Sequence, residues 1–251
     1  MVTGTAAGTV AEGWLLREPR PASESGTLLF CFPYLGTGAS MFYSWPRMIG
    51  PVEVCPIQPP GRENRLAEPS YESYPSLAAA MIEALRPYLD RRYALFSHCN
   101  TVYALYEFVE QLEAAGLPLP VRFVASAMVP PSLLPFGTIL DLPDTELAEV
   151  VAGFMRARGA EADPELVELA LEPVAADLRA YRDYRPSLGK LSCAVTSIAW
   201  NADTNVRPEL AEKWAEVPEA RLHRLNGDHW AFLRCPPELR AVLLEDCGEE
   251  G

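Results

Sequence analysis

The stretch YALFSHCNT, residues 93–101, decides the fold of this chain. Its apolar start ends in a short polar turn, and an apolar spacing typical of a helix begins at Val102. We therefore predict a strand, a sharp turn and a helix, with Cys99 at the apex. In a G-x-S-x-G turn of this kind, a nucleophile is presented above a parallel sheet. Here Ser97 and Thr101 stand at the glycine positions, and the nucleophile would be a thiol.

Five further runs predict strands on either side of this stretch. They cover residues 27–33, 52–57, 121–127, 193–200 and 221–225. Amphipathic helical spacing lies between them and after them, over residues 74–89, 102–112, 209–217 and 236–244. This alternation is typical of an α/β protein with a mostly parallel central sheet and flanking helices. A chain of 251 residues that is 49% hydrophobic can bury such a core as one domain, residues 1–251.

The alternation of strands and helices breaks between Pro130 and Leu188. Two or three helical patterns follow one another there without a strand, one starting at residues 142–145 and another running from Pro164 to Tyr184. We interpret residues 130–188 as a helical insertion that covers the site as a lid. A merely structural helical subdomain is the alternative.

Charge and cysteine content exclude several classes of function. The chain has 34 acidic and 21 basic residues and a formal net charge of −13, without a Lys/Arg-rich tract, so we expect no nucleic-acid or membrane partner. Residues 1–8 lack the basic and apolar parts of a signal peptide, and no apolar run could span a bilayer, which predicts a cytoplasmic protein. The six cysteines form no C-x-x-C pair, so we expect neither a metal site nor a disulfide framework.

A nucleophilic thiol needs a neighbouring base, and the base needs a third group that orients it. Such groups collect at the carboxyl ends of strands in an open α/β sheet. Asp203 follows the 193–200 strand, and Asp228 and His229 follow the 221–225 strand. We predict Cys99 as the nucleophile, Asp203 as the orienting acid and His229 as the base. This chain order is the one that the α/β-hydrolase fold uses, and we predict that fold with a helical lid insertion.

The other candidates for the acid and the base are weaker. His223 lies within a strand and could point at solvent or at the sheet surface. His98 is adjacent to the nucleophile, where successive side chains point apart. Asp228 is too near His229 in sequence to reach around its ring easily.

Backbone N–H groups near the nucleophile would stabilise an oxyanion. We expect one from Asn100, which follows Cys99, and one from the loop at Tyr34 and Leu35 after the first strand.

Five motifs along nearly the whole chain resemble, in the correct order, the type II thioesterases that accompany polyketide synthases and nonribosomal peptide synthetases. LFCFPY at 29–34 resembles a strand ending in F-P-H-A-G, and QPPGRENR at 58–65 resembles Q-L-P-G-R-E-x-R. FSHCNT at 96–101 stands where the family has F-G-H-S-M-G, DTNV at 203–206 where it has D-P-x-V, and GDHWAFL at 227–233 resembles G-G-H-F-F-L. The chain departs from the family at the site itself: Cys99 replaces the serine, Ser97 and Thr101 replace the glycines, and Tyr34 replaces a histidine.

The resemblance implies an enzyme that acts on acyl or aminoacyl thioesters held on the phosphopantetheine arm of an acyl or peptidyl carrier protein. It implies no cofactor of the enzyme's own, and we expect a monomer. Some cysteine-bearing relatives are aminoacyl shuttles, and exchange of one thioester for another is close to thermoneutral. We therefore favour transfer through a Cys99 acyl-enzyme to another thiol. Hydrolytic editing or release is the first alternative, and a noncatalytic carrier-binding scaffold is the second.

Two features of substrate recognition stay open in the sequence. Carrier proteins are usually acidic, so a local basic patch could dock one, with Arg62, Arg65, Arg91 and Arg92 as candidates. Ordinary surface arginines are the alternative. The substrate-binding residues and the acyl group are left unassigned, because the pocket depends on lid side chains that the sequence does not place.

Overall fold

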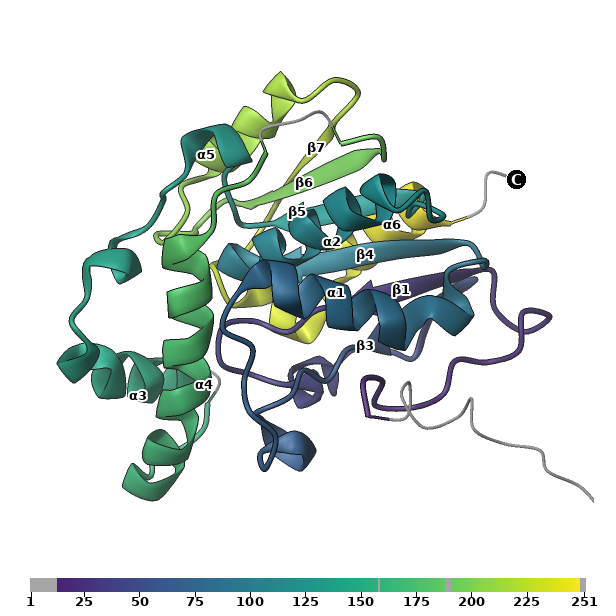
Figure 1. Cartoon of the computed structure of the whole chain (residues 1–251). Helices are drawn as coiled ribbons and strands as arrows, with labels where there is room; N and C mark the ends of the chain where they lie inside the picture. Colours follow the sequence, from purple (N-terminus) through teal and green to yellow (C-terminus); the bar gives the residue numbers. More distant parts are fainter. Residues whose placement is uncertain (1–12, 158, 188–190, 249–251) are drawn as a thin grey trace, which may run out of the picture.

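A computed structural model describes residues 13–157, 159–187 and 191–248 of the chain (Figure 1). Residues 1–8, where we expected no targeting signal, and Leu188 at the end of the predicted insertion lie outside the described residues.

Seven strands of the described chain form one sheet in the order β2-β3-β1-β4-β5-β6-β7. Their bounds are β1 Thr27–Cys31, β2 Met48–Ile49, β3 Val52–Pro56, β4 Tyr93–His98, β5 Arg122–Ser126, β6 Val195–Trp200 and β7 Arg221–Leu225. All neighbours pair in parallel except the two-residue β2, which runs antiparallel to β3. The predicted mostly parallel α/β sheet is confirmed, and β2 is an element that we did not predict.

The helices lie on both faces of the sheet and at one of its ends. The α-helices are α1 Tyr74–Leu85, α2 Val102–Ala114, α3 Leu147–Ala157, α4 Pro164–Asp183, α5 Pro208–Ala211 and α6 Pro237–Cys247. The predicted helix over 74–89 ends early, because Arg86–Tyr88, which contains Pro87, forms a 3₁₀ turn. The predicted helix over 209–217 is a single α-turn, α5, that continues as a 3₁₀ helix over Glu212–Glu216.

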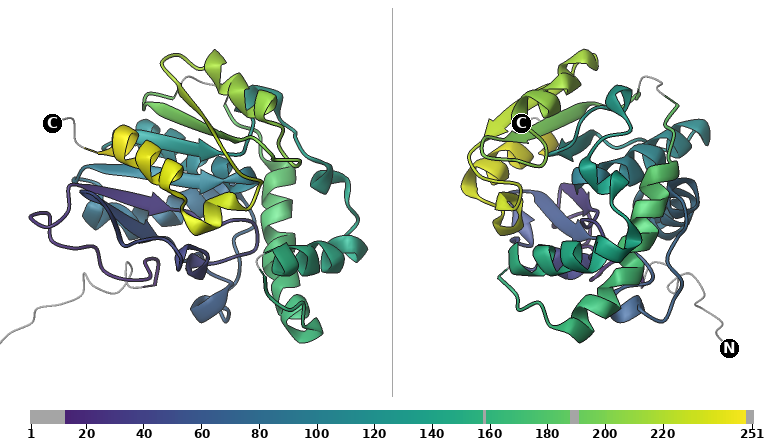
Figure 2. Two further views of the ribbon diagram at one scale, coloured as in Figure 1. Left: turned by 180° about the vertical axis from the view of Figure 1, so that it is seen from behind. Right: turned by 90° about the vertical axis from the view of Figure 1, so that its left-hand side faces the viewer.

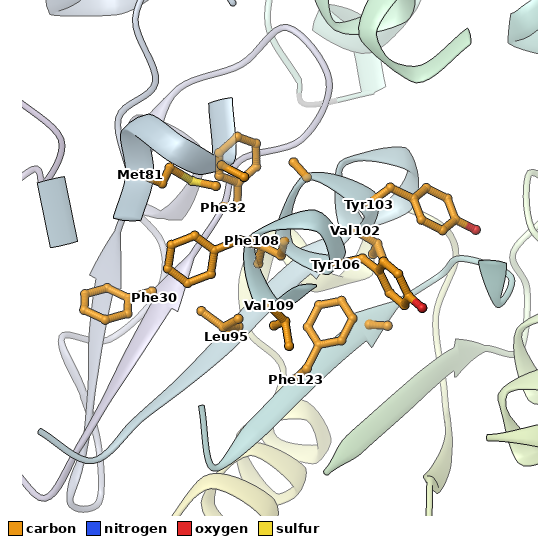
Figure 3. Packing of buried hydrophobic residues seen from close by; sticks show 14 of the residues in the cluster. Phe30, Phe32, Met81, Leu95, Val102, Tyr103, Tyr106, Phe108, Val109 and Phe123 are labelled. Atoms are coloured by element: carbon orange, nitrogen blue, oxygen red, sulfur yellow. The ribbon is translucent and has the colours of Figure 1, made fainter. Parts of the chain in front are cut away.

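Successive side chains along each strand point to opposite faces of the sheet, which divides the core into two layers. On one face, Leu95 of β4 and Phe123 of β5 pack against α1 and α2, and Figure 3 shows Phe108 and Val109 of α2 over them. On the other face, Phe96 of β4 belongs to the cluster that includes α6 (Figure 2). Because both faces of the strands are covered, they read as continuous apolar runs in the sequence.

The segment between β5 and β6 stands at the carboxyl ends of the strands (Figures 1 and 2). It contains α3, α4 and three short 3₁₀ turns, Pro131–Leu133, Thr138–Asp141 and Asp144–Glu146. Helix α4 begins where Pro164 predicted it, and Asp163 caps it by accepting the N–H groups of Glu165 and Leu166. No helix in the described residues is both long and apolar enough to cross a membrane.

Candidate active site

Cys99 occupies a tight turn at the carboxyl end of β4. Its φ is +61°, a left-handed conformation that is uncommon for a residue other than glycine and marks a sharp change of chain direction. The 3₁₀ turn Cys99–Thr101 and then α2 follow directly. The structure therefore has the strand, turn and helix predicted from the sequence, with Cys99 at the apex.

Hydroxyl groups support this turn where the related motif has glycines. The Oγ of Ser97 and the Oγ1 of Thr101 lie 2.9 Å apart, and Thr101 also donates to the carbonyl of His98 at 3.0 Å. Both hydroxyl side chains are fully buried. Because Thr101 donates to the His98 carbonyl, Ser97 donates to Thr101, and the pair is satisfied within the turn.

Asp203 and His229 meet beside Cys99 although 26 residues separate them. The Nδ1 of His229 lies 2.8 Å from the Oδ2 of Asp203, and the other carboxylate oxygen accepts the N–H groups of Asn205 and Val206 at 2.8 and 2.9 Å. Asp228 is not at this position, because it accepts the N–H of Trp230 within its own loop. The loops after β6 and β7 thus bring together the acid and the base that the sequence suggested.

The protonation of His229 depends on both neighbours. Burial opposes the charged ring, but the hydrogen bond with Asp203 and the adjacent Cys99 sulfur outweigh burial and raise the pKa of His229 to about 10. A charged imidazole at this position is a proton donor beside the Cys99 sulfur.

His98 lies closer to the base than we expected. Its ring stacks on Phe232 at 3.8 Å and is 4.6 Å from the ring of His229, centroid to centroid. Side chains alternate within a strand, but that rule does not extend past His98 because Cys99 is left-handed. Burial and the charge on His229 keep the pKa of His98 well below its usual value, so it is a neutral neighbour.

A buried hydrogen-bond chain holds the His98 ring. The Nε1–H of Trp200 donates to the Oγ of Ser126 at 3.0 Å, and that Oγ lies 2.9 Å from the Nδ1 of His98. The chain thus holds the His98 ring beside that of His229. Ser126 and Trp200, which hold His98 in place, were not predicted from the sequence. Their positions at the ends of β5 and β6 are the one feature of the sequence that could have indicated them.

The loop after β1 contributes Tyr34 and Leu35 to the site. The Tyr34 N–H donates to the Sδ of Met41 at 3.2 Å, so it is occupied, which corrects our expectation that it could serve an oxyanion. Leu35 and Asn100 both line the cavity at Cys99 and remain the candidate donors.

An open cavity of about 760 Å³ leads to Cys99. Its walls come from the β1 loop, the nucleophile turn, the loop after β6 and the β5–β6 segment. Apolar lining residues include Met128, Phe136, Ile139, Leu140, Leu142 and Phe154. The cavity is large enough for an acyl group on a flexible arm.

The four arginines suggested for carrier docking all make hydrogen bonds within the chain. Arg62 is buried and pairs with Asp177 through two hydrogen bonds, and Arg65 bonds Glu68 and lies over the ring of Trp14. Arg91 binds the carbonyl of Arg20, and Arg92 binds that of Gly248. Arg62 is therefore buried away from any docking surface, whereas Arg65 and Arg91 are partly exposed and Arg92 is exposed, so carrier docking at these three residues stays a prediction.

The third histidine, His223, is also engaged. Its Nε2 lies 3.1 Å from the Oδ2 of Asp246 in α6, remote from the cavity residues. His223 therefore lies at the sheet surface beside α6 and is partly exposed, which is one of the two expected positions. His229 is thus the histidine that combines a carboxylate partner with a position beside Cys99.

Comparisons with known proteins assign the family. Residues 27–243 match the thioesterase domain family, so the chain belongs to that family. It is 31% identical to the linear gramicidin dehydrogenase LgrE of Brevibacillus parabrevis, over 92% of this chain and 91% of that protein. It is 32% identical to the thioesterase PikA5 of Streptomyces venezuelae, over 82% and 74%. Among solved structures, the type II thioesterase BorB from the borrelidin biosynthetic cluster superposes with a TM-score of 0.80 at 28% identity, covering 97% of this chain and all of that one.

Proposed function

We propose that this enzyme acts on acyl or aminoacyl thioesters carried by the phosphopantetheine arm of an acyl or peptidyl carrier protein in polyketide or nonribosomal peptide biosynthesis. Its membership in the thioesterase family supports the reaction class, and the similarity to PikA5 and to BorB supports the setting. In this proposal Cys99 carries the acyl group covalently, His229 is the base and Asp203 orients it. Residues 130–188 act as the lid.

One observation carries the covalent role of Cys99. A thiol stands in a left-handed turn at the end of β4, opens to the cavity, and has a hydrogen-bonded His229–Asp203 pair beside it. A strained backbone at a ligand cavity is a feature of functional sites, and the neighbouring base provides what a thiol needs to become a thiolate.

The first half-reaction loads Cys99. The thiolate attacks the thioester carbonyl carbon, a new C–S bond forms, and the bond to the pantetheine sulfur breaks. His229 gives its proton to that leaving sulfur. The N–H groups of Asn100 and Leu35 are the proposed donors to the oxyanion.

The second half-reaction transfers the group to another thiol. The acceptor thiol loses its proton to His229, attacks the acyl carbon, and displaces the Cys99 thiolate. Because both the bond broken and the bond formed are thioester C–S bonds, the step is reversible, as a shuttle requires.

Hydrolysis is the second candidate function. The names of PikA5 and BorB describe thioesterases, and water could replace the acceptor thiol in the same geometry. The products then differ: free acid is released, and no acyl group reaches another carrier.

The test presents a labelled acyl-carrier protein with and without a second, empty carrier. We expect the label on the acceptor, with little free acid. Free acid at the same rate in both mixtures, with no label on the acceptor, would contradict transfer and support hydrolysis. Cys99→Ala should abolish either reaction. Cys193→Ala, a change at another partly accessible thiol, is the matched control and should not.

The scaffold alternative makes a different prediction in the same mixtures. A noncatalytic carrier-binding protein would yield neither free acid nor labelled acceptor, and Cys99→Ala would change nothing.

A further inference from the structure

Aromatic rings surround the base of the proposed triad. The Tyr34 ring lies 5.9 Å from that of His229, 5.3 Å from Trp230 and 5.2 Å from Phe154, each at a steep, edge-to-face angle. Trp230 lies 5.3 Å from His229 and 5.7 Å from Phe154. We call Tyr34, Phe154 and Trp230 the aromatic collar.

Three distant parts of the chain build the collar. Tyr34 comes from the loop after β1, Phe154 from α3 and Trp230 from the loop after β7. Tyr34 is only 3% exposed, and edge-to-face contacts of this kind add stability beyond simple burial. The collar is therefore a packed feature and not a chance contact of surface rings.

The collar leaves the two reacting groups in different environments. The Nδ1 of His229 is taken by Asp203, which leaves its buried Nε2 with the Cys99 sulfur as the polar neighbour. Cys99 itself is partly exposed and lines the cavity. A buried water molecule needs about two to four polar partners. The Tyr34 hydroxyl is engaged with the Cys99 sulfur, and the other two collar residues offer ring surface around the His229 ring, so a water there would have few polar partners.

Deacylation by water and by a thiol makes different demands on this space. Water must be placed and deprotonated at Nε2 before it can attack. An acceptor thiol on a long arm is positioned by the rest of that arm in the cavity, and its sulfur is itself compatible with an apolar surface.

We propose that the aromatic collar, with Tyr34 at its centre, keeps water from the Nε2 of His229 and so directs the Cys99 acyl group to a thiol acceptor. This inference rests on the proposed function, and it identifies the feature that decides between transfer to a thiol and hydrolysis. Tyr34 stands where the resembling family has a histidine, whose ring nitrogens would offer water a hydrogen-bond partner. Burial and the neighbouring Cys99 raise the pKa of Tyr34 well above its usual value, so its hydroxyl stays protonated and adds no charge.

The test measures the fate of a preformed acyl-enzyme. The protein is loaded from a short acyl-pantetheine thioester, freed of excess reagent, and followed by intact mass spectrometry with and without added pantetheine. The ratio of hydrolysis to transfer should rise about tenfold in Tyr34→His, and also in Phe154→Ala, because either change admits water. Tyr34→Phe keeps the ring and should stay within about threefold of the wild type.

Tyr43→His is the matched control, because Tyr43 lies between β1 and β2 and is 72% exposed. It should leave the ratio of hydrolysis to transfer unchanged. Phe154→Ala tests the same claim from α3 if the Tyr34 variant fails to fold. An acyl-enzyme that forms but keeps the wild-type ratio in both collar variants would overturn the collar and leave the proposed function intact. A wild-type protein that never forms an adduct on Cys99 would overturn both.

Discussion

Two buried hydroxyl groups hold the turn that carries Cys99. In a G-x-S-x-G turn the glycines let strand and helix pack closely, and any larger side chain must find room there. Here the hydroxyl groups of Ser97 and Thr101 hydrogen-bond one another across the turn, so both larger side chains are accommodated between strand and helix. This pairing explains how the turn keeps Cys99 left-handed without either glycine.

Thr101→Val should therefore weaken the turn. The substitution keeps the volume but removes the bonds to Ser97 and to the His98 carbonyl, so we expect a loss of about 1–3 kcal/mol in the free energy of unfolding. Urea denaturation measures this loss, with Thr145→Val on the surface as the control. Equal stability of the two variants would mean that the hydroxyl pair does not support the turn.

Asp203→Asn should slow the reaction of Cys99 with iodoacetamide at pH 7 by about tenfold or more, because His229 loses its charge partner. The raised pKa of His229 means that the charged ring stabilises the fold fully below the ordinary histidine pKa of about 6.5 and that this contribution is lost as the pH rises through about 10. The difference in the free energy of unfolding between wild type and Asp203→Asn should therefore shrink as the pH rises from about 6.5 to about 10.

The matched control is Asp228→Asn, one residue before His229. It should keep the wild-type rate of alkylation and the wild-type pH profile. A similar slowing in both variants would show that loop structure, and not the carboxylate, controls the thiol.

At the scale of elements, Asp177 of α4 joins two loops, the one after β3 that carries Arg62 and the one after β1 that carries Tyr34. The guanidinium of Arg62 binds both oxygens of Asp177 at 2.9 and 3.1 Å, and Asp177 also accepts the N–H of Gly36 at 2.7 Å. A Cβ on Gly36 would come within 2.2 Å of Val174, and its φ of +68° also favours glycine. The position of the β1 loop is thus set by α4.

The end of α4 is fixed by tyrosines. Tyr181 stacks on Tyr103 of α2 at 5.8 Å, and Tyr184, just past the helix, packs against Tyr74 of α1 at 5.2 Å. These contacts anchor the carboxyl-terminal end of α4 against α1 and α2.

Arg62→Met should destabilise the protein by about 3–5 kcal/mol, because it leaves the Asp177 carboxylate buried without its partner. Thermal unfolding measures the effect. Arg86→Met is the control: Arg86 pairs with Glu83 on the surface, and such pairs contribute about 0–1 kcal/mol. A loss no larger than that of the control would contradict a structural role for the Arg62–Asp177 pair.

Elements and site were not equally predictable from the sequence. The parallel strands are apolar runs, and the order of Cys99, Asp203 and His229 could be read because each follows a strand. By contrast, β2 has two residues and too short a pattern to detect. The burial of Arg62 could not be predicted, since its partner is 115 residues away and the charge alone suggested a surface. The aromatic collar was not predicted either, because Tyr34, Phe154 and Trp230 are also far apart in sequence.

At the scale of the whole molecule, Asp246 ties α6 to the edge of the sheet. Its buried carboxylate accepts from Thr196 of β6 and lies next to Arg221 and His223 of β7. Burial alone would raise the pKa of this carboxyl, but these three partners outweigh it and hold the pKa well below the usual range.

Asp246→Asn should cost about 2–4 kcal/mol near neutral pH. Because the folded-state pKa of Asp246 is lowered, its contribution is complete above the ordinary carboxyl value of about 3.9 and is lost as the pH falls through the lowered one. The stability gap from the wild type should therefore narrow only in strong acid. Chemical denaturation across pH tests this, with exposed Asp90→Asn as the control. A gap that does not depend on pH would contradict the ionic role.

The proposed transfer reaction depends on Cys99 being the residue that carries the acyl group. The most direct measurement is intact and peptide-level mass spectrometry of the protein after brief mixing with an acyl-carrier protein. We expect a mass gain equal to the acyl group, located on the peptide that contains Cys99 and removed by an added thiol acceptor. A protein that turns over substrate with Cys99 unmodified, or after Cys99→Ala, would contradict it.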